Sequence, residues 1–329
     1  MRITILFGGT NKERLVSVAS AQALHSALPE ADLWFWDADD TVHETSSEAL
    51  LNHSRPFEDP FKPATQSVGR IEQALDRARA QDRLLVLGLH GGTAENGELQ
   101  AMCEMRGIAF TGSGSASSHL AFDKVAAKRF AAIAGVGAPA GVKLEDIEPA
   151  LAKYGKLIAK PARDGSSYGL IYVNAKQDLI AVRNAAKLEE YVIEPFISGV
   201  EATCGVLERP DGSVFSLPPI EIVPAEGAFD YTAKYLLKST QEICPGRFSP
   251  EIGAEIMELA LRAHHALSCS GYSRTDFIVS AKGPIYLETN TLPGLTKASL
   301  YPKALKAQGI DFVDFLRDQI VLAERRAQK

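Results

Sequence analysis

Hydrophobic and polar positions in the first third of the chain follow the pattern of a sheet covered by helices. Short apolar runs recur, and between them the apolar residues are spaced as on one face of a helix. Strands that alternate with helices predict a parallel sheet with helices on its faces. Segment 40–69 is polar and rich in proline and serine, so we expect mostly loop with one short helix. The predicted strands are 2–7, 33–38 and 84–90, and the predicted helices are 12–28, 71–79 and a stretch after residue 97.

Beyond residue 113 the pattern is typical of α+β modules, so the whole chain is predicted to be an α/β protein. A long irregular stretch at 225–249 contains Tyr231, Tyr235 and Leu236. Because such apolar side chains are unusual in a solvated linker, we interpret this stretch as a lid over a reaction site. The predicted helices are 124–134, 145–153, 177–187, 251–269 and a terminal one, and the predicted strands are 156–162, 169–173, 191–196, 201–208 and 214–223.

The composition is that of an ordinary folded protein. Of 329 residues, 46% are hydrophobic and 23% are charged, and the formal net charge is −6. This charge argues against a general nucleic-acid or acidic-membrane partner, although a local basic pocket is compatible with it. The four cysteines form no C-x-x-C pair, which favours isolated thiols over zinc or disulfides. The chain opens on a strand rather than a leader and has no apolar run long enough to span a bilayer, so we expect a cytoplasmic protein.

An acidic hairpin near the carboxyl terminus is the strongest local signal. The runs TDFIVS and PIYLET flank the tripeptide 281–283, which we interpret as a three-residue turn. A turn centred on Lys282 sets Asp276 opposite Glu288, and the strand period of two adds Asn290 on the same face. Facing carboxylates repel, so a hard divalent cation between them, Mg²⁺ or Mn²⁺, explains the pattern. The alternative is a solvated hairpin edge with scattered acids.

A second group of residues is suited to phosphate and nucleotide. Lys160 ends a predicted strand and precedes a glycine-serine-serine turn at 165–167, whose backbone N–H groups can point at phosphate oxygens. Glu194 and Glu201 are suited to an adenine edge and to ribose hydroxyls. The alternatives are an ordinary hairpin turn and two surface charges. Because the P-loop and G-x-G-x-x-G patterns are both missing, a different nucleotide fold is required.

Several motifs occur together in an order that is specific to one family: FGGTNKERLVS, LHGGTAENGELQ, FTGSGSASSHLAFDK, KPARDGSSYG, DYTAKY, SRTDF and LETNTLPGLTKASL. With them the chain resembles the D-alanine:D-alanine ligase family of ATP-grasp enzymes over nearly its whole length. The resemblance implies an N-terminal substrate-side domain (1–113), a central ATP-grasp lid domain (114–198) and a C-terminal ATP-grasp domain with the metal and oxyanion sites (199–329). ATP would bind between the last two domains.

The resemblance also implies an activity and partners. Such an enzyme uses ATP to phosphorylate the carboxylate of one D-alanine, and the amine of a second D-alanine then attacks the acyl phosphate, giving a dipeptide for peptidoglycan synthesis. Two Mg²⁺ or Mn²⁺ ions would assist, and the family suggests a homodimer. The alternative within this class is an ATP-grasp ligase for a different amino-acid pair.

Residues that match the family motifs take their expected roles from it. For ATP and the metal ions, the resemblance implies that Lys124 and Lys160 hold the phosphates, Glu194 and Glu201 the adenosine, and Asp276, Glu288 and Asn290 the metal ions.

For the amino-acid substrates, the resemblance places His90 beside the first substrate, and Ser299 and Leu300 at the second. Arg274 and the backbone N–H of Gly294 would stabilise the oxyanion that develops during attack.

The family lid also has expected counterparts. Glu13 would pair with the ammonium group of the first substrate and, with Ser166 and Tyr235, would form a hydrogen-bonded set when the lid closes. Lys234 would reach the transferred phosphate. A tyrosine at position 235 favours an amide product over an ester.

Three residues depart from the family pattern: Leu15 replaces an acid, Asn96 replaces an aspartate, and Tyr168 replaces a small aliphatic residue. Two rival functions from other classes remain. A nucleotide-binding regulatory protein without chemistry would bind ATP but release no phosphate. A nicotinamide oxidoreductase would need the glycine fingerprint that the first strand lacks.

Overall fold

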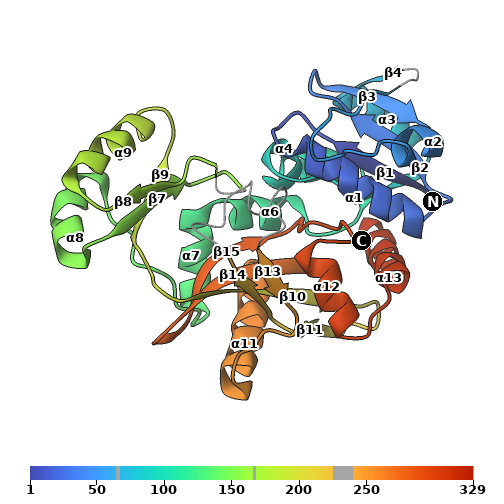
Figure 1. The fold of residues 1–329 in the computed structure, drawn as a ribbon. Coiled ribbons are helices and arrows are strands. Elements are labelled where there is room, and N and C mark those ends of the chain that lie inside the picture. Colours follow the sequence, from blue (N-terminus) through green and yellow to red (C-terminus); the bar gives the residue numbers. More distant parts are fainter. Residues whose placement is uncertain (64–66, 166–167, 225–239, 329) are drawn as a thin grey trace.

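The computed structural model describes residues 1–63, 67–165, 168–224 and 240–328, which form three sheets with their covering helices (Figure 1). The sheets follow one another along the chain. Three predicted site residues, Ser166, Lys234 and Tyr235, lie outside the described residues, as does most of the expected lid.

The first sheet has the strand order β4-β3-β2-β1-β5-β6 and helices on both faces. Ile5 and Phe7 pack in the same core as α1, whereas Leu6 packs in the core that holds α3 and α5, because successive side chains of a strand point to opposite faces. Its strands are β1 (Arg2–Gly8), β2 (Asp32–Trp36), β3 (Thr41–Thr45), β4 (Ser67–Arg70), β5 (Arg83–Leu87) and β6 (Ala109–Phe110). Its helices are α1 (Arg14–Ala27), α2 (Ser47–Leu51), α3 (Ile71–Ala80), α4 (Gly92–Glu95) and α5 (Glu98–Met105).

The predicted parallel sheet is confirmed for β2, β1, β5 and β6, and two antiparallel strands extend it at one edge. The pairs β1–β2, β1–β5 and β5–β6 are parallel, but β3 and β4 pair antiparallel with their neighbours. Both extra strands come from segment 40–69, which was expected to be mostly loop, while α2 confirms its short helix. In β3 only Val42 is buried. Although β3 lies between β4 and β2, it therefore carries too few apolar residues to produce a strand pattern.

The second sheet is small and antiparallel, with the order β8-β7-β9, and α8 and α9 cover one of its faces (Figure 1). The helix and strand predictions for this region are confirmed. The elements are α8 (Ile147–Tyr154), β7 (Leu157–Pro161), β8 (Ile171–Val173), α9 (Leu179–Ala185) and β9 (Tyr191–Pro195), with one-turn 3-10 helices at Leu144–Asp146 and Lys176–Asp178.

The third sheet is antiparallel and has the order β13-β12-β10-β14-β15, with β11 paired to β10. Two predictions are corrected here: the run 214–223 forms two strands, and the irregular stretch contains β13. The strands are β10 (Val200–Glu208), β11 (Val214–Ser216), β12 (Ile220–Val223), β13 (Gln241–Ile243), β14 (Tyr272–Ser280) and β15 (Gly283–Asn290). The helices packed around it are α6 (Ser115–Phe122), α7 (Lys124–Ile133), α11 (Pro250–Ala266), α12 (Leu300–Ala307) and α13 (Phe312–Ala327). Of these, α6 was not predicted, and the single terminal helix that was expected is two helices, α12 and α13.

The acidic hairpin has the predicted pairing, but its turn is shorter than predicted and one strand contains a bulge. Asp276 faces Glu288, as expected. However, Ser280 pairs with Gly283, so the turn has two residues instead of three. A bulge between Asp276 and Phe277 shifts the ladder by one residue and restores the pairing.

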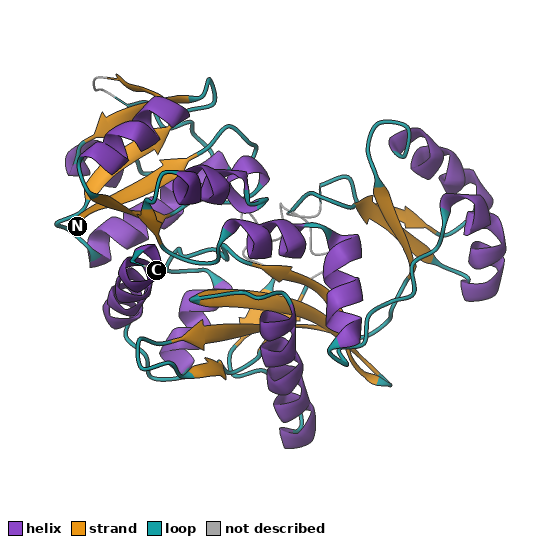
Figure 2. Ribbon diagram, turned by 180° about the vertical axis from the view of Figure 1, so that it is seen from behind, coloured by secondary structure: helices purple, strands orange, loops and turns teal. Residues whose placement is uncertain are grey.

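The first and third sheets share one hydrophobic core. The ring of Phe315 on α13 makes a T-shaped contact with the ring of Tyr272 on β14, and its centroid lies 5.5 Å from that of Tyr301 on α12. The same cluster contains Ile5 and Phe7 of the first sheet. Arg326 of the same helix donates to backbone carbonyls in and after β6. The small second sheet has a separate core. The view from behind shows α13 lying between the first and third sheets, while the second stands apart (Figure 2).

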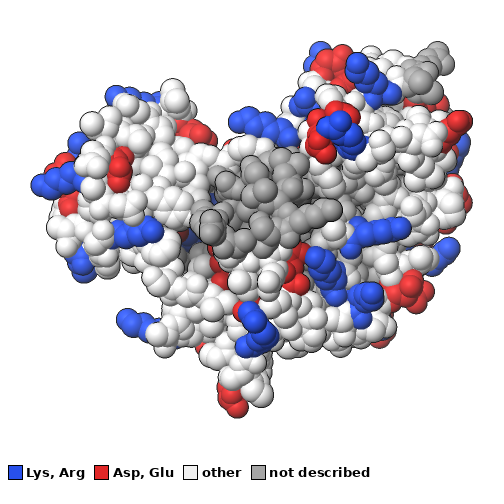
Figure 3. All heavy atoms as spheres, in the orientation of Figure 1, with Lys and Arg blue, Asp and Glu red and all other residues white. Residues whose placement is uncertain are grey.

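Opposite charges are interspersed over the surface shown in Figure 3, so they partly compensate one another there. Within the described ranges, every helix is too short or too polar to cross a bilayer.

We predict that Phe315→Ala lowers the free energy of unfolding by about 3–5 kcal/mol, because it opens a cavity where the two sheets share their core. Urea denaturation measures the change. Arg317→Ala on the same helix is the control, since that side chain is 62% exposed and its substitution changes stability by less than about 0.5 kcal/mol. Equal losses in both variants would contradict the shared core.

Candidate functional site

A cavity of about 340 Å³ opens where the second sheet faces the third and the loops of the first. This volume is at the lower end of the range for small-molecule sites. Every predicted site residue that the structure describes lines it: Glu13, His90, Lys124, Lys160, Glu194, Glu201, Arg274, Asp276, Glu288, Asn290, Gly294, Ser299 and Leu300.

Strand alternation explains why the third sheet presents a polar face to this cavity. In β14, Arg274 and Asp276 line the cavity, whereas Thr275 between them is fully buried on the opposite face. In β15, Glu288 and Asn290 are two residues apart, so they point to the same face, and both line the cavity. The hairpin therefore gathers a guanidinium, two carboxylates and an amide on one surface.

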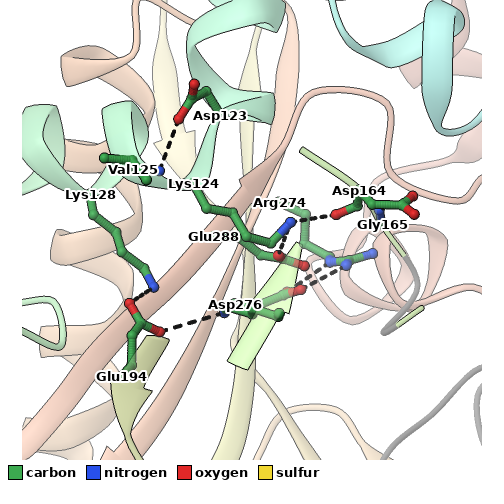
Figure 4. A network of polar contacts seen from close by, with 11 residues as sticks. Asp123, Lys124, Val125, Lys128, Asp164, Gly165, Glu194, Arg274, Asp276 and Glu288 are labelled. Carbon is green, nitrogen blue, oxygen red and sulfur yellow. Dashed lines mark hydrogen bonds and ion pairs between the residues drawn. The ribbon is translucent and has the colours of Figure 1, made fainter. Parts of the chain in front are cut away.

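Each acid of the hairpin has a cationic partner. Arg274 binds the Asp276 carboxylate through two hydrogen bonds of 3.0 and 2.9 Å, and Thr203 donates a third of 2.5 Å (Figure 4). Lys124 of α7 lies 3.3 Å from the Glu288 carboxylate. Such ion pairs offset the repulsion between facing acids. The repulsion between the two carboxylates therefore does not by itself require the divalent cation that was expected between them.

The hairpin nevertheless offers suitable donors for a hard cation. Asp276, Glu288 and Asn290 present only carboxylate and amide oxygens as potential ligands, and all three line the cavity. Among the described residues, no three acid, histidine or cysteine side chains are clustered for metal binding. An ion here would thus need the Asn290 oxygen or oxygens from a bound substrate, as Mg²⁺ sites usually do.

The segment that follows β7 contacts both α7 and the first sheet. The ammonium group of Lys124 donates to the backbone carbonyl of Asp164 in this segment. A Cβ atom at Gly165 would lie 3.0 Å from a Glu13 carboxylate oxygen, and one at Gly91 would lie 3.1 Å from the Glu13 carboxyl carbon. The Glu13 carboxyl group therefore lies close to the backbone at both Gly91 and Gly165.

The second sheet contributes a buried charge cluster. Along β7, Leu157 and Ala159 point into the local core, while Lys160 points into the cavity. The Lys160 ammonium lies 3.9 Å from the carboxylate of Glu194 on β9, which is only 2% exposed. Lys128 of α7 pairs with the other oxygen of the same carboxylate (Figure 4).

His90 follows β5 and is a buried neutral imidazole. Its Nδ1 lies 3.1 Å from the Leu292 carbonyl, which can only accept, so Nδ1 carries the proton. Its Nε2 then accepts from the Ser20 hydroxyl at 2.8 Å. Burial lowers the pKa of His90 to about 4. At neutral pH the imidazole therefore adds no charge to the cavity.

Two polar residues of the site were missed in the sequence analysis. Glu95 is buried at the end of α4, accepts from the Gly91 N–H at 3.0 Å, and accepts from Asn290 at 2.6 Å when the Asn290 amide is oriented with its nitrogen toward Glu95. Burial first, and then the nearby Glu13, raise the pKa of Glu95 to about 8. The other residue is Lys128, which lies one helical turn after Lys124. That spacing was the available signal, since it puts both lysines on the same face of a helix.

The far end of the cavity is formed around the start of α12. Ser299 is the residue before this helix, and its hydroxyl lies 2.8 Å from that of Thr296 and 3.1 Å from the Thr296 N–H. A Cβ atom at Gly294 would lie 2.8 Å from the Ser299 hydroxyl. Only glycine fits so close to this hydroxyl without displacing it.

The three departures from the family pattern lie in different surroundings. Tyr168 lines the cavity, and the ammonium of Lys12 lies 5.1 Å from its ring centroid. Asn96 ends α4 and accepts from the Glu98 N–H at 2.9 Å. Leu15 is half-buried in the first turn of α1. Of the three, only Tyr168 reaches the cavity.

Comparisons with known proteins agree over almost the whole chain. A family model described as D-ala D-ala ligase N-terminus matches residues 2–113, and one described as D-ala D-ala ligase C-terminus matches residues 145–321. A D-alanine–D-alanine ligase of Cupriavidus necator is 35% identical, covering 98% of this chain and 91% of its own. One of Nitratidesulfovibrio vulgaris is 37% identical, covering 95% and 94%.

Solved structures are similar as well. The VanG D-Ala:D-Ser ligase from Enterococcus faecalis has a TM-score of 0.79 and 31% identity, covering 98% of this chain and 99% of its own. The D-alanine–D-alanine ligase from Bacillus anthracis has a TM-score of 0.76 and 28% identity, covering 100% and 99%. These similarities support the ATP-grasp architecture expected from the motifs.

We predict that His90 titrates near pH 4, as followed by NMR of its labelled ring. Because its folded pKa lies below the unfolded value, the neutral form favours folding, and this contribution is lost as the pH falls from about 6.5 to about 4. His90→Gln should therefore lose less stability than the wild type between pH 7 and pH 4.5. His119→Gln, on an exposed residue of α6, is the control. A His90 midpoint near its ordinary value would refute the prediction.

Proposed function

The chain belongs to the D-alanine–D-alanine ligase family, and on this premise we propose that it joins two D-alanine molecules with cleavage of ATP, forming a dipeptide for peptidoglycan synthesis. The observation that carries the proposal is that every described residue with an expected role lines the same cavity. The expected division of the chain after residues 113 and 198, and the homodimer, remain proposals that rest on the family resemblance.

ATP would bind between the second and third sheets. Lys124 and Lys160 would meet its phosphates, and Glu194 and Glu201 its adenosine. The charge arrangement supports this assignment, because both lysines line the cavity and each already faces a carboxylate. A triphosphate entering the cavity would therefore meet ammonium groups that are held in place.

Asp276, Glu288 and Asn290 would hold Mg²⁺ or Mn²⁺, two ions in all. Bound there, the ions would neutralise phosphate charge and polarise the transferred phosphoryl group. The all-oxygen donor set supports this choice of metal. In the present arrangement Arg274 donates to both oxygens of Asp276 and Thr203 donates to Oδ1, so an ion would bind the remaining lone pair of Oδ2.

The chemistry would proceed in two transfers. A carboxylate oxygen of the first D-alanine attacks the γ-phosphorus of ATP, and the bond to the bridging oxygen breaks, so that ADP leaves and an acyl phosphate remains. The amine of the second D-alanine then attacks the acyl carbon. The tetrahedral intermediate collapses with loss of inorganic phosphate, and the amine gives up a proton, which completes the amide.

The residues around the acyl carbon have matching tasks. Arg274 and the Gly294 N–H would stabilise the oxyanion, because hydrogen bonds from fixed donors strengthen as negative charge develops on that oxygen. Glu13 would pair with the first ammonium group beside the neutral His90. Ser299 and Leu300, at the start of α12, would receive the carboxylate of the second substrate, because a helix N-terminus favours an anion. Ser166, Lys234 and Tyr235 keep their expected lid roles.

A ligase that takes D-serine as its second substrate is the second candidate. It is favoured by the similarity to the VanG D-Ala:D-Ser ligase at 31% identity and a TM-score of 0.79. The two candidates share the first transfer and differ only in the amine that attacks the acyl phosphate.

We predict that the protein with ATP, Mg²⁺ and D-alanine yields D-alanyl-D-alanine, ADP and phosphate in equal amounts, detected by mass spectrometry and a phosphate assay. D-serine, D-lactate and L-alanine are tested together with D-alanine as competing second substrates. Predominance of the mixed D-alanyl-D-serine product would support the second candidate. ATP turnover that needs only L-amino acids would overturn both.

We predict that Glu288→Gln lowers kcat by more than about 100-fold, because even residues that support a metal ligand contribute about 10–100-fold. It should also raise the Mg²⁺ concentration required for half-maximal activity. Glu258→Gln, which removes an exposed acid on α11, is the control and should leave both values unchanged. An unchanged Mg²⁺ requirement in Glu288→Gln would exclude this residue as a metal ligand.

A further inference from the structure

We propose that Lys128 is a positioning residue of the nucleotide site, which neutralises the Glu194 carboxylate from behind and so leaves the Lys160 ammonium available to the phosphates of ATP. The inference rests on the proposed function, since it deepens the account of the same cavity. No motif in the sequence assigned a role to Lys128.

Helix α7 places this lysine away from solvent. Lys124 and Lys128 are one turn apart and therefore lie on the same face of the helix. Lys128 is only 8% exposed, whereas the next residue, Arg129, is exposed to solvent. A lysine is rarely buried to this extent unless it is paired.

The pairing is with a carboxylate that is even more deeply buried. Glu194 is 2% exposed and receives the Lys128 ammonium on one oxygen, while Lys160 lies 3.9 Å from the other (Figure 4). Among the described residues, Glu194 and Lys160 line the cavity, and Lys128 does not. Lys128 therefore approaches the Glu194 carboxylate from outside the cavity.

Electrostatics explains why two lysines serve one acid. A buried carboxylate is costly unless it is paired. With Lys128 present, Glu194 is already neutralised, and the group of three keeps one positive charge that faces the cavity. Without Lys128, Lys160 becomes the nearest cation to Glu194 and is drawn toward it. The phosphates would then have to compete with Glu194 for the same ammonium group.

The charged groups that face Lys128 are Glu194 from β9, Lys160 from β7 and Glu288 from β15. Burial first, and then the neighbouring Lys160, lower the pKa of Lys128 to about 8. Lys128 is therefore largely protonated at pH 7 and loses its charge as the pH rises through about 8. The positive charge of Lys128 therefore depends on pH and can be followed as a second readout besides substitution.

The test compares Lys128→Met, Lys128→Arg and Arg129→Met in the full-length protein. In Lys128→Met we expect the KM for ATP to rise about 10- to 100-fold, the range given by one charge-assisted contact. The KM for D-alanine should change less than about twofold, because the change lies at the nucleotide end of the cavity. Lys128→Arg should recover most of the ATP affinity, and Arg129→Met should match the wild type.

The pH dependence separates positioning from a merely structural role. In the wild type the KM for ATP should rise above about pH 8, whereas Lys128→Arg should show no such rise, because a guanidinium keeps its charge. Equal pH profiles in these two proteins would overturn the proposal. So would a folded Lys128→Met variant with the ATP affinity of the wild type, or one whose KM values for ATP and D-alanine rise together.

Calorimetric titration with ATP and Mg²⁺ keeps this inference separate from the ligase activity. If the wild type binds ATP but releases no ADP with D-alanine, the proposed function fails, and the affinities of the variants still test Lys128. If Lys128→Met does not fold, the comparison of wild type and Lys128→Arg across pH decides the question by the same titration.

Discussion

Two carboxylates that face each other across one antiparallel ladder impose the constraint on which this site depends. Asp276 and Glu288 point into the same cavity, and like charges at this spacing destabilise a sheet unless cations lie beside them. Arg274 supplies one cation from the same strand, and Lys124 supplies the other from α7. Because Lys124 also donates to the Asp164 carbonyl, the same ammonium group contacts both the hairpin and the segment that follows β7.

The hydrophobic cores divide the molecule into two parts: the first and third sheets together, and the second sheet. The first and third sheets share a core through α13, so the loops that carry Glu13 and His90 are fixed relative to the hairpin. The second sheet, which carries Lys160 and Glu194, has its own core. A displacement of that sheet would alter polar contacts across the cavity without opening a hydrophobic core. The cavity thus lies at the boundary where relative movement costs least.

Much of the fold and the site could be predicted where a feature depends on local periodicity. The pairing of Asp276 with Glu288 was predicted from the strand period and a three-residue turn. The structure has the same pairing, but with a two-residue turn and a bulge that compensates for the missing residue. Strand β3 was missed because only Val42 in it is buried. The other residues of β3 are polar, so it shows no apolar alternation although it is paired on both sides.

The amino-acid sequence alone determined the helices and strands with a strong apolar pattern, the motifs of the family, and the residue types that surround the cavity, because periodicity and motif spacing are properties of neighbouring residues. Only the tertiary structure decided the partners of Lys128 and Glu95. Lys128 meets Glu194 across 66 positions of the chain, and Glu95 meets Asn290 through packing of the first sheet on the third. Burial and pairing of charges depend on which distant segments pack together, so no local pattern encodes them.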